Sequence, residues 1–309
     1  MADAAGPPAG PPLGSSAADS GHGAPRRAWA PPSGRAPIAV ALDAPDGPTA
    51  LRWARWVAPH AAVLKIGMEL FFREGPAIVN TLRDEGLLVP SGSGGGPGPV
   101  CARAGQSPTP RAGGAAAGEQ PAAPGAPELF LDLKLHDIPA TVAGGIRSVA
   151  RLAPRFVTVH AAGGTAMIRA AVEAAGEAGG GSAGPLDIAA VTVLTSLDEA
   201  ALAAVGLAGP PADAVRRLAV LAVSAGAKAL VCSPKEVRMV REELGNDVTL
   251  ITPGVRPVGS DQADQARTAT PGQALADGAD LLVIGRPITS APDPAARAAA
   301  VAASLLSPL

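Results

Sequence analysis

Short runs of Val, Ile, Leu and Ala alternate along the chain with longer stretches whose apolar residues recur at the helical period. This alternation predicts βαβ units and a parallel sheet. Eight runs have the length and aliphatic content of buried strands. They are Ile38–Leu42, Ala62–Ile66, Leu129–Lys134, Phe156–His160, Ile188–Leu194, Ala229–Cys232, Thr249–Thr252 and Leu281–Ile284. Eight consecutive units favour a closed α/β barrel, the TIM (β/α)₈ fold, over an open doubly wound sheet, which more usually has six or fewer strands.

Two segments interrupt this pattern. Residues 1–36 are mainly Ala, Gly, Pro and Ser, which bury too little apolar surface to offset the entropy of ordering, so we expect a disordered N-terminal arm. Residues 91–127 have the same composition and predict a flexible, low-complexity insertion. The remainder of residues 37–309 is expected to form one catalytic barrel domain of close to the ~250 residues typical of this fold.

The insertion lies between the helical stretch after the second strand and the start of the third strand. It is therefore an αβ loop, and such loops lie at the face of a barrel that contributes to stability. Active sites form at the opposite face, at the carboxyl ends of the strands. We expect the insertion to leave the active site undisturbed.

Composition and charge narrow the class of protein. The hydrophobic fraction of 47% is enough for a substantial core, and the net charge of −2 with no basic stripe argues against a nucleic-acid partner. Cys101 and Cys232 lie far apart, without a Cys or His at metal-ligand spacing, so neither a disulfide framework nor a metal site is expected.

The chain has no signature of membrane insertion or export. No apolar stretch approaches the roughly 18 to 20 residues that span a bilayer, and the N-terminus lacks the apolar run of a secretory signal. Arg26 and Arg27 are followed by AWAPPSG, whereas a twin-arginine signal requires an apolar segment there. The sequence predicts a cytoplasmic protein with no membrane partner.

The segment FLDLKLHDIPATV carries charges within the third predicted strand. Alternation places Asp132 and Lys134 on one face, with Phe130, and the leucines between and before them on the other. The charges would then point inward near the barrel mouth, where unpaired ions carry a large desolvation cost. Lys65, near the end of the second strand, and Asp137, in the loop after the third, are the expected partners.

Two lysines interleaved with two aspartates form a nearly neutral group in which carboxylates keep each ammonium protonated. Such a group supplies a general acid at neutral pH. An isolated D-x-K can equally be a buried ion pair or a solvated pair on an exposed strand edge. Its place at the end of a barrel strand, with Lys65 similarly placed, favours the functional interpretation.

Together, DLKLHDIPATV and LKIGMELF resemble the orotidine 5′-phosphate decarboxylase family, and the resemblance extends from about Ile38 to Leu306 without the insertion. It implies cofactor- and metal-independent loss of CO₂ from orotidine 5′-phosphate, giving UMP in pyrimidine biosynthesis. A Lys-Asp-Lys-Asp array does this chemistry in the family.

By motif position the array corresponds to Lys65, Asp132, Lys134 and Asp137. The resemblance also implies a homodimer with shared active sites, in which Asp137 and Thr141 act in the neighbouring subunit's site. Loss of CO₂ from C6 leaves a carbanion in the ring plane that cannot delocalise as an enolate does. We expect Lys134 to stabilise this charge and to protonate C6, with Asp132 beside the departing carboxylate.

The loops after the seventh and eighth strands are candidates for phosphate binding, as in many barrels. Gly285 permits close approach of the backbone, and Arg286 offers a charged planar fork suited to phosphate. The resemblance adds Arg256 and Gln265 as phosphate contacts. Taken alone, a Gly-Arg pair after a strand is as typical of an ordinary surface arginine as of a phosphate ligand.

Several single residues have two interpretations. The resemblance makes Asp43 an acceptor for the ribose hydroxyls, whereas it could instead cap the following helix. It makes Thr195 a hydrogen-bonding partner of the pyrimidine, a position otherwise typical of a plain strand residue. His136 fits a loop or interface residue and His160 a strand-end histidine with its hydrogen bonds satisfied, because neither has a ligand partner at metal spacing.

Two other functions remain open from the sequence. A sugar-phosphate decarboxylase or aldolase-type lyase of the same superfamily also uses D-x-K-x-x-D but binds Mg²⁺, and LHDIPATV with LKIG favours the nucleotide enzyme. A non-catalytic phosphate-binding or regulatory barrel is the other alternative. The chain departs from the family in its arm, its insertion and Ala140, where an asparagine is common.

Overall fold

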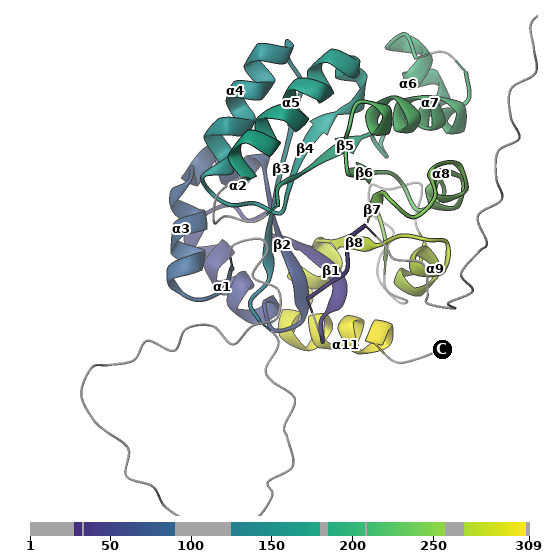
Figure 1. The fold of residues 1–309 in the computed structure, drawn as a ribbon. Helices are drawn as coiled ribbons and strands as arrows, with labels where there is room; N and C mark the ends of the chain where they lie inside the picture. The colour runs from purple at the N-terminus through teal and green to yellow at the C-terminus, as the bar shows by residue number, and fades with distance from the viewer. Residues whose placement is uncertain are drawn as a thin grey trace, which may run out of the picture.

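The computed structural model describes residues 28–32, 34–89, 125–179, 185–207, 209–256 and 269–306. Within these residues, eight parallel strands pair in chain order, and β8 pairs with β1 to close a barrel (Figure 1). The strands are β1 (Ala36–Ala41), β2 (Ala61–Gly67), β3 (Glu128–Leu135), β4 (Phe156–His160), β5 (Asp187–Val191), β6 (Ala229–Val231), β7 (Thr249–Pro253) and β8 (Leu281–Ile284). The TIM barrel is confirmed, although the fifth strand ends at Val191 and not at Leu194.

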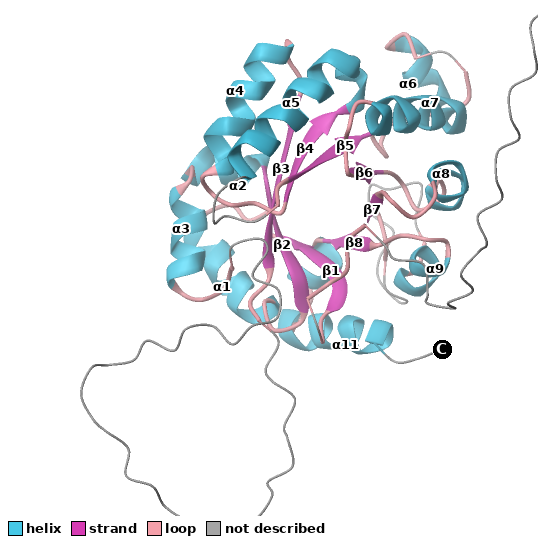
Figure 2. Ribbon diagram, viewed as in Figure 1, coloured by secondary structure: helices cyan, strands magenta, loops and turns pink. Residues whose placement is uncertain are grey.

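Helices surround the barrel on its outside (Figure 2). They are α1 (Gly47–Val57), α2 (Met68–Glu74), α3 (Ala77–Asp84), α4 (Pro139–Ala150), α5 (Gly164–Gly179), α6 (Glu199–Ala204), α7 (Pro211–Ser224), α8 (Val237–Leu244), α9 (Pro271–Ala276), α10 (Arg286–Thr289) and α11 (Pro294–Leu306), with a 3₁₀ turn, η1 (Ala161–Gly163), after β4. No helix among the described residues has the length and apolar content needed to cross a membrane.

Several helices begin where the sequence supplies a capping side chain. The Asp46 carboxylate accepts a hydrogen bond from the Thr49 N–H at 2.7 Å and so caps α1, whose first turn contains a proline. Asp198 and Thr270 cap α6 and α9 in the same way. Each cap satisfies an N–H that has no partner within its helix.

The two faces of β3 divide as strand alternation predicts. Leu129, Leu131 and Leu133 belong to the outer core, between the strands and the helices. Phe130 points into the barrel, where its ring makes an edge contact with Phe156 at a centroid distance of 5.8 Å. The same alternation turns the charged positions of β3 toward the barrel interior.

A tryptophan from the N-terminal segment closes the amino end of the barrel. Trp29 is 5% exposed, lies 6.1 Å from the Phe156 ring centroid and donates from Nε1 to Glu128 Oε2 at 3.1 Å. Arg35 is also buried and donates to the backbone carbonyls of Ala58 and Ala61. The expectation of disorder was wrong for Trp29 and Arg35, because both gain buried partners. Residues 1–27 lie outside the described residues.

The predicted insertion follows α3 and precedes β3, at the amino end of the barrel as expected. Residues 90–124 lie outside the described residues. On either side of them, the Val89 N–H donates to the Pro127 carbonyl at 3.1 Å, and Arg35 Nε donates to the Gly125 carbonyl at 2.6 Å. Residues 125–127 are therefore bonded to the barrel, and the expected boundary at 127 extended too far.

Candidate active site

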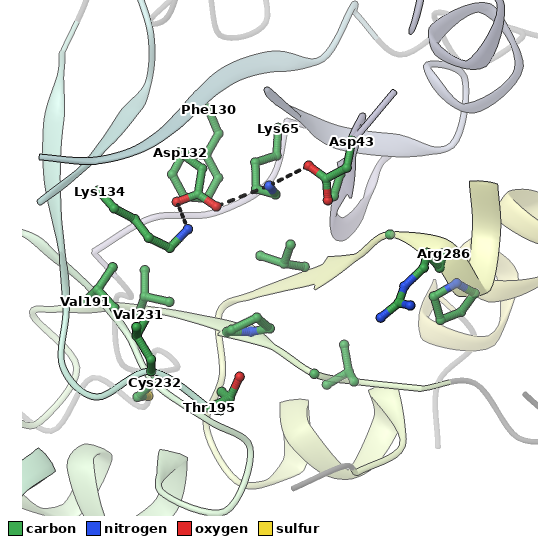
Figure 3. Close-up of a pocket in the computed structure, with 18 of the residues that line it drawn as sticks. Asp43, Lys65, Phe130, Asp132, Lys134, Val191, Thr195, Val231, Cys232 and Arg286 are labelled. Atoms are coloured by element: carbon green, nitrogen blue, oxygen red, sulfur yellow. Dashed lines mark hydrogen bonds and ion pairs between the residues drawn. The ribbon is translucent and has the colours of Figure 1, made fainter. Parts of the chain in front are cut away.

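A cavity of about 330 Å³ opens at the carboxyl ends of the strands (Figure 3). Its lining includes most of the residues selected from the sequence, carried by β2, β3, the loops after β1, β5, β7 and β8, and the start of α10. These are Asp43, Lys65, Asp132, Lys134, Thr195, Arg256, Gly285 and Arg286. The structure therefore gathers in one place residues that are up to 243 positions apart, as Asp43 and Arg286 show.

Four of these side chains form a continuous chain of ion pairs. Lys65 Nζ lies 3.2 Å from Asp43 Oδ1 and 3.1 Å from Asp132 Oδ2, and Lys134 Nζ lies 2.7 Å from Asp132 Oδ1 (Figure 3). Positive and negative groups alternate along it, as expected for three of its members. The fourth partner in this chain is Asp43. Because Asp46 caps α1, the alternative in which Asp43 is that cap is wrong.

Burial and charge act in opposite directions on the middle of this chain. The side chains of Lys65 and Asp132 are only 8% and 13% exposed. Burial alone would lower the pKa of Lys65, but Asp132 and Asp43 outweigh it and raise that pKa above its usual value. Burial would likewise raise the pKa of Asp132, but Lys65 and Lys134 hold it below its usual value. Both groups are therefore charged at neutral pH.

The backbone of β3 is irregular where it enters the site. Its pairing with β4 passes from Leu131 opposite Val157 to Leu135 opposite Val159, so β3 has two extra residues there. Lys134, within this bulge, has a φ of 49°, which is uncommon for a residue with a side chain. Strained backbone of this kind is typical of functional sites.

Thr158 is a site residue that was not predicted from the sequence. Its hydroxyl donates to Asp132 Oδ1 at 3.0 Å and accepts from the Lys134 backbone N–H at 2.8 Å. Alternation along β4 could have found it, because Phe156 points into the barrel and Thr158 therefore faces the same way. A lone threonine in a buried strand carries no other signal.

Two arginines, Arg256 and Arg286, also line the cavity. In Figure 3, Arg286 lies on the opposite side from Lys134. Gly285, just before α10, is tightly packed, since a Cβ atom there would lie 3.3 Å from the Ala41 Cβ. Arg256 follows β7, and its N–H donates to the Ala269 carbonyl at 2.9 Å. Gln265 falls within residues 257–268 and lies outside the described residues.

Asp137 and Thr141 do not line this cavity in their own chain. Both are exposed, and Asp137 Oδ1 accepts a hydrogen bond from the Ile138 N–H at 2.6 Å, at the start of the loop before α4. One chain therefore does not bring together all four members predicted for the array.

Two histidines and a cysteine near the barrel mouth form no part of the ion-pair chain. The rings of His136 and His160 lie 5.5 Å apart, and burial, together with His136 and Lys134, lowers the pKa of His160. Cys232 lines the cavity, and burial raises the pKa of its thiol. Among the described residues, no three His, Cys, Asp or Glu side chains are grouped so as to hold a metal ion.

A family model matches residues 36–89 and 122–301, on both sides of the insertion. It describes the orotidine 5'-phosphate decarboxylase / HUMPS family. The chain belongs to this family. The match includes every residue proposed above for the site.

Individual relatives agree with the family model. The orotidine 5'-phosphate decarboxylase of Frankia casuarinae is 65% identical over 277 residues, which are 90% of each chain. That of Thermobifida fusca is 61% identical, over 87% of this chain and 96% of its own. The crystal structure of orotidine 5'-phosphate decarboxylase from Lactobacillus acidophilus is 31% identical, with a TM-score of 0.68, over 88% of this chain and 100% of the other.

Proposed function

We propose that the protein decarboxylates orotidine 5′-phosphate to UMP and CO₂, the step that forms UMP in pyrimidine biosynthesis. The observation that carries this proposal is the ion-pair chain that ends at Lys134, in a cavity that also contains Arg286. The decarboxylase names of the relatives at 65% and 61% identity support it over the other branches of the family.

The reaction breaks the bond between C6 and the carboxylate, and its electron pair stays on C6. Lys134 is the group we assign to this charge, because its ammonium reaches the cavity and can donate a proton to C6 once CO₂ departs. A preorganised cation stabilises the developing carbanion without having to reorient during the reaction. No cofactor takes part in this scheme.

Asp132 orients this acid. Its Oδ1 holds Lys134 Nζ at 2.7 Å, and its Oδ2 is held in turn by Lys65. Since Asp132 stays ionised at neutral pH, it would lie as a fixed negative charge beside the departing carboxylate. We assign it mainly to preorganising Lys134.

The rest of the cavity is assigned to substrate recognition. Arg286 and Arg256, with Gln265, would bind the phosphate, while Thr195 would bond the pyrimidine and Asp43 the ribose. The phosphate does not react, yet the energy of binding it can lower the barrier to decarboxylation. Asp43 could serve the ribose and Lys65 together, because its carboxylate is 57% exposed and contacts Lys65 through one oxygen.

We further propose a homodimer in which Asp137 and Thr141 act in the partner's site. Both residues are exposed, and large apolar side chains are exposed nearby along the chain and on the neighbouring helix α2: Ile138 at 66% and Phe72 at 74%. In the proposed dimer, these exposed apolar side chains would be covered by the partner subunit.

Mixing two inactive variants tests the shared site. Lys134→Ala and Asp137→Ala should each be inactive alone. A mixed dimer would pair the intact Lys134 of one subunit with the intact Asp137 of the other, so exchange of subunits should restore about a quarter of wild-type activity. If subunit exchange is verified and no activity returns, the shared site is contradicted.

The reaction itself is tested by incubating the purified protein with orotidine 5′-phosphate and EDTA, and following the loss of substrate absorbance. We expect turnover that EDTA does not reduce and that Lys134→Ala abolishes, although this variant should still bind a substrate analogue. Loss of activity with EDTA would favour the Mg²⁺-dependent sugar-phosphate lyase. Binding without CO₂ release by the wild type would favour a regulatory barrel. The cytoplasmic location remains a prediction from the sequence.

A further inference from the structure

We propose that Thr158 is a positioning residue that fixes the Lys134 ammonium in the active site through one hydroxyl group. The proposal rests on the roles assigned above to Lys134 and Asp132. Thr158 is not among the residues that line the cavity, so it would act through its neighbours and not on the substrate.

The hydroxyl of Thr158 joins the backbone of Lys134 to the side chain that holds its ammonium. It accepts from the Lys134 N–H at 2.8 Å and donates to Asp132 Oδ1 at 3.0 Å. Asp132 Oδ1 is also the oxygen that holds Lys134 Nζ at 2.7 Å. The Thr158 hydroxyl oxygen therefore positions both ends of Lys134. It bonds the backbone N–H directly, and it positions the ammonium through the Asp132 carboxylate.

The bulge in β3 explains why a hydroxyl is needed here. The regular pairing of β3 with β4 is interrupted between Leu131 and Leu135. Lys134 lies in this interval with a φ of 49°, and its N–H donates to the hydroxyl of Thr158 on β4. A backbone N–H left without a partner inside the fold is destabilising. The Thr158 hydroxyl therefore stabilises the unusual backbone conformation that directs Lys134.

Donor capacity sets the direction of both hydrogen bonds. A threonine hydroxyl has a single proton, and the Lys134 N–H can only donate, so the hydroxyl accepts there and donates to Asp132. Thr158 is fully buried, so bulk water does not reach its hydroxyl. A side chain of the same shape without the hydroxyl would break both contacts.

Two variants separate the hydroxyl from the volume of the side chain. Thr158→Val keeps the shape and removes the hydroxyl, whereas Thr158→Ser keeps the hydroxyl and removes the methyl group. We expect Thr158→Val to lower kcat roughly 10- to 100-fold, the scale for displacing a catalytic group by about 1 Å. The KM should change less than about 3-fold, since the assigned phosphate and base contacts are untouched. Thr158→Ser should recover most of kcat.

The pH profile supplies a second readout that a packing defect would not move. Asp132 is faced by Lys65 from β2, Lys134 from β3, and Thr158 and His160 from β4. The Thr158 hydroxyl donates to the charged carboxylate and favours it, so its removal raises the pKa of Asp132. The acid limb of the kcat profile should shift to higher pH in Thr158→Val and return toward the wild-type position in Thr158→Ser.

The outcomes distinguish this inference from the proposed function. If Lys134→Ala abolishes turnover while Thr158→Val keeps kcat within about 2-fold, only the role of Thr158 is overturned. If Thr158→Ser is as slow as Thr158→Val, side-chain packing explains the loss, and the role of the hydroxyl is also overturned. If Lys134→Ala retains near-normal turnover, the assignment of the acid itself fails. Circular dichroism and thermal unfolding should show that each variant is folded.

Discussion

Gly67 lies so close to Asp43 that a Cβ atom added to it would come within 2.8 Å of the Asp43 carboxylate Oδ1. The same Cβ would lie 3.3 Å from Lys65 Nζ. Gly67 ends β2 and pairs in register with Asp132 of β3. A glycine at this point lets the ion pair between Asp43 and Lys65 pass directly over the backbone of β2.

Gly67→Ala should therefore lower activity by displacing the Asp43–Lys65 pair. Overpacking usually costs about 1 to 3 kcal/mol. We expect a loss of transition-state stabilisation on this scale, measured as a lower kcat/KM. Gly176→Ala is a matched control, because Gly176 lies in α5 with nothing within 4 Å of an added Cβ. Steady-state kinetics of both variants decide the question, and equal activities would show that Asp43 moves aside without consequence.

Arg286→Ala should weaken kcat/KM by roughly 2 to 4 kcal/mol, the scale for removing one partner of a charge-assisted contact. The guanidinium lines the cavity at the start of α10, where the phosphate is assigned. Arg216→Ala serves as the control, since Arg216 forms an exposed ion pair with Glu243 on the outer helices. A change below ~0.5 kcal/mol for Arg286→Ala would remove it from the phosphate site.

His160 should make the stability of the fold depend on pH. Burial, His136 and Lys134 lower the pKa of His160 in the folded state below its usual value. As pH falls below that value, the unfolded chain binds the proton first, so the free energy of unfolding decreases until the folded pKa is reached. Urea unfolding between pH 5 and pH 8 should show this decrease, and His160→Gln should reduce its slope. An unchanged slope in the variant would contradict the assignment.

The sequence was sufficient for those features that depend on local pattern. Alternation along β3 placed Asp132 and Lys134 on the inner face and the leucines on the outer one, as the structure has them. It could not give the bulge at Lys134, because a bulge depends on the pairing of two strands. The hydroxyl contact of Thr158 follows from that bulge, so it was missed as well.

Trp29 shows the opposite limit. Composition alone assigned it to a disordered arm, but one aromatic side chain is enough to fix a short segment when a buried site accepts it. Phe156 and Glu128, which contact Trp29, are each about 100 residues or more from it along the chain. No local pattern encodes contacts of this range. The role of Asp137 is beyond local pattern for a similar reason, since it would require a second subunit.

Deletion of residues 91–124 should leave kcat largely intact. The segment joins α3 to β3 at the amino end of the barrel, whereas the cavity lies at the carboxyl end. Val89 and Pro127 already lie within hydrogen-bonding distance at 3.1 Å, so a short linker can replace the segment. Residues 125–127 should be kept, because the Gly125 carbonyl accepts from Arg35. A large loss of kcat in a folded deletion variant would contradict this placement.

Trp29→Ala should destabilise the fold without changing the chemistry. Removing a buried aromatic side chain costs about 3 to 5 kcal/mol of unfolding free energy. Trp29→Phe should recover part of this loss, since a phenyl ring can still pack against Phe156 but cannot donate to Glu128. Trp56→Ala is the control, because that side chain is 37% exposed and its removal should cost less.

Urea unfolding measures the stability of each variant. The kcat of Trp29→Ala at neutral pH should stay close to the wild-type value, because Trp29 lies at the end of the barrel opposite the cavity. A large fall in kcat for a folded Trp29→Ala protein would instead mean that the amino end of the barrel controls the geometry of the ion-pair chain.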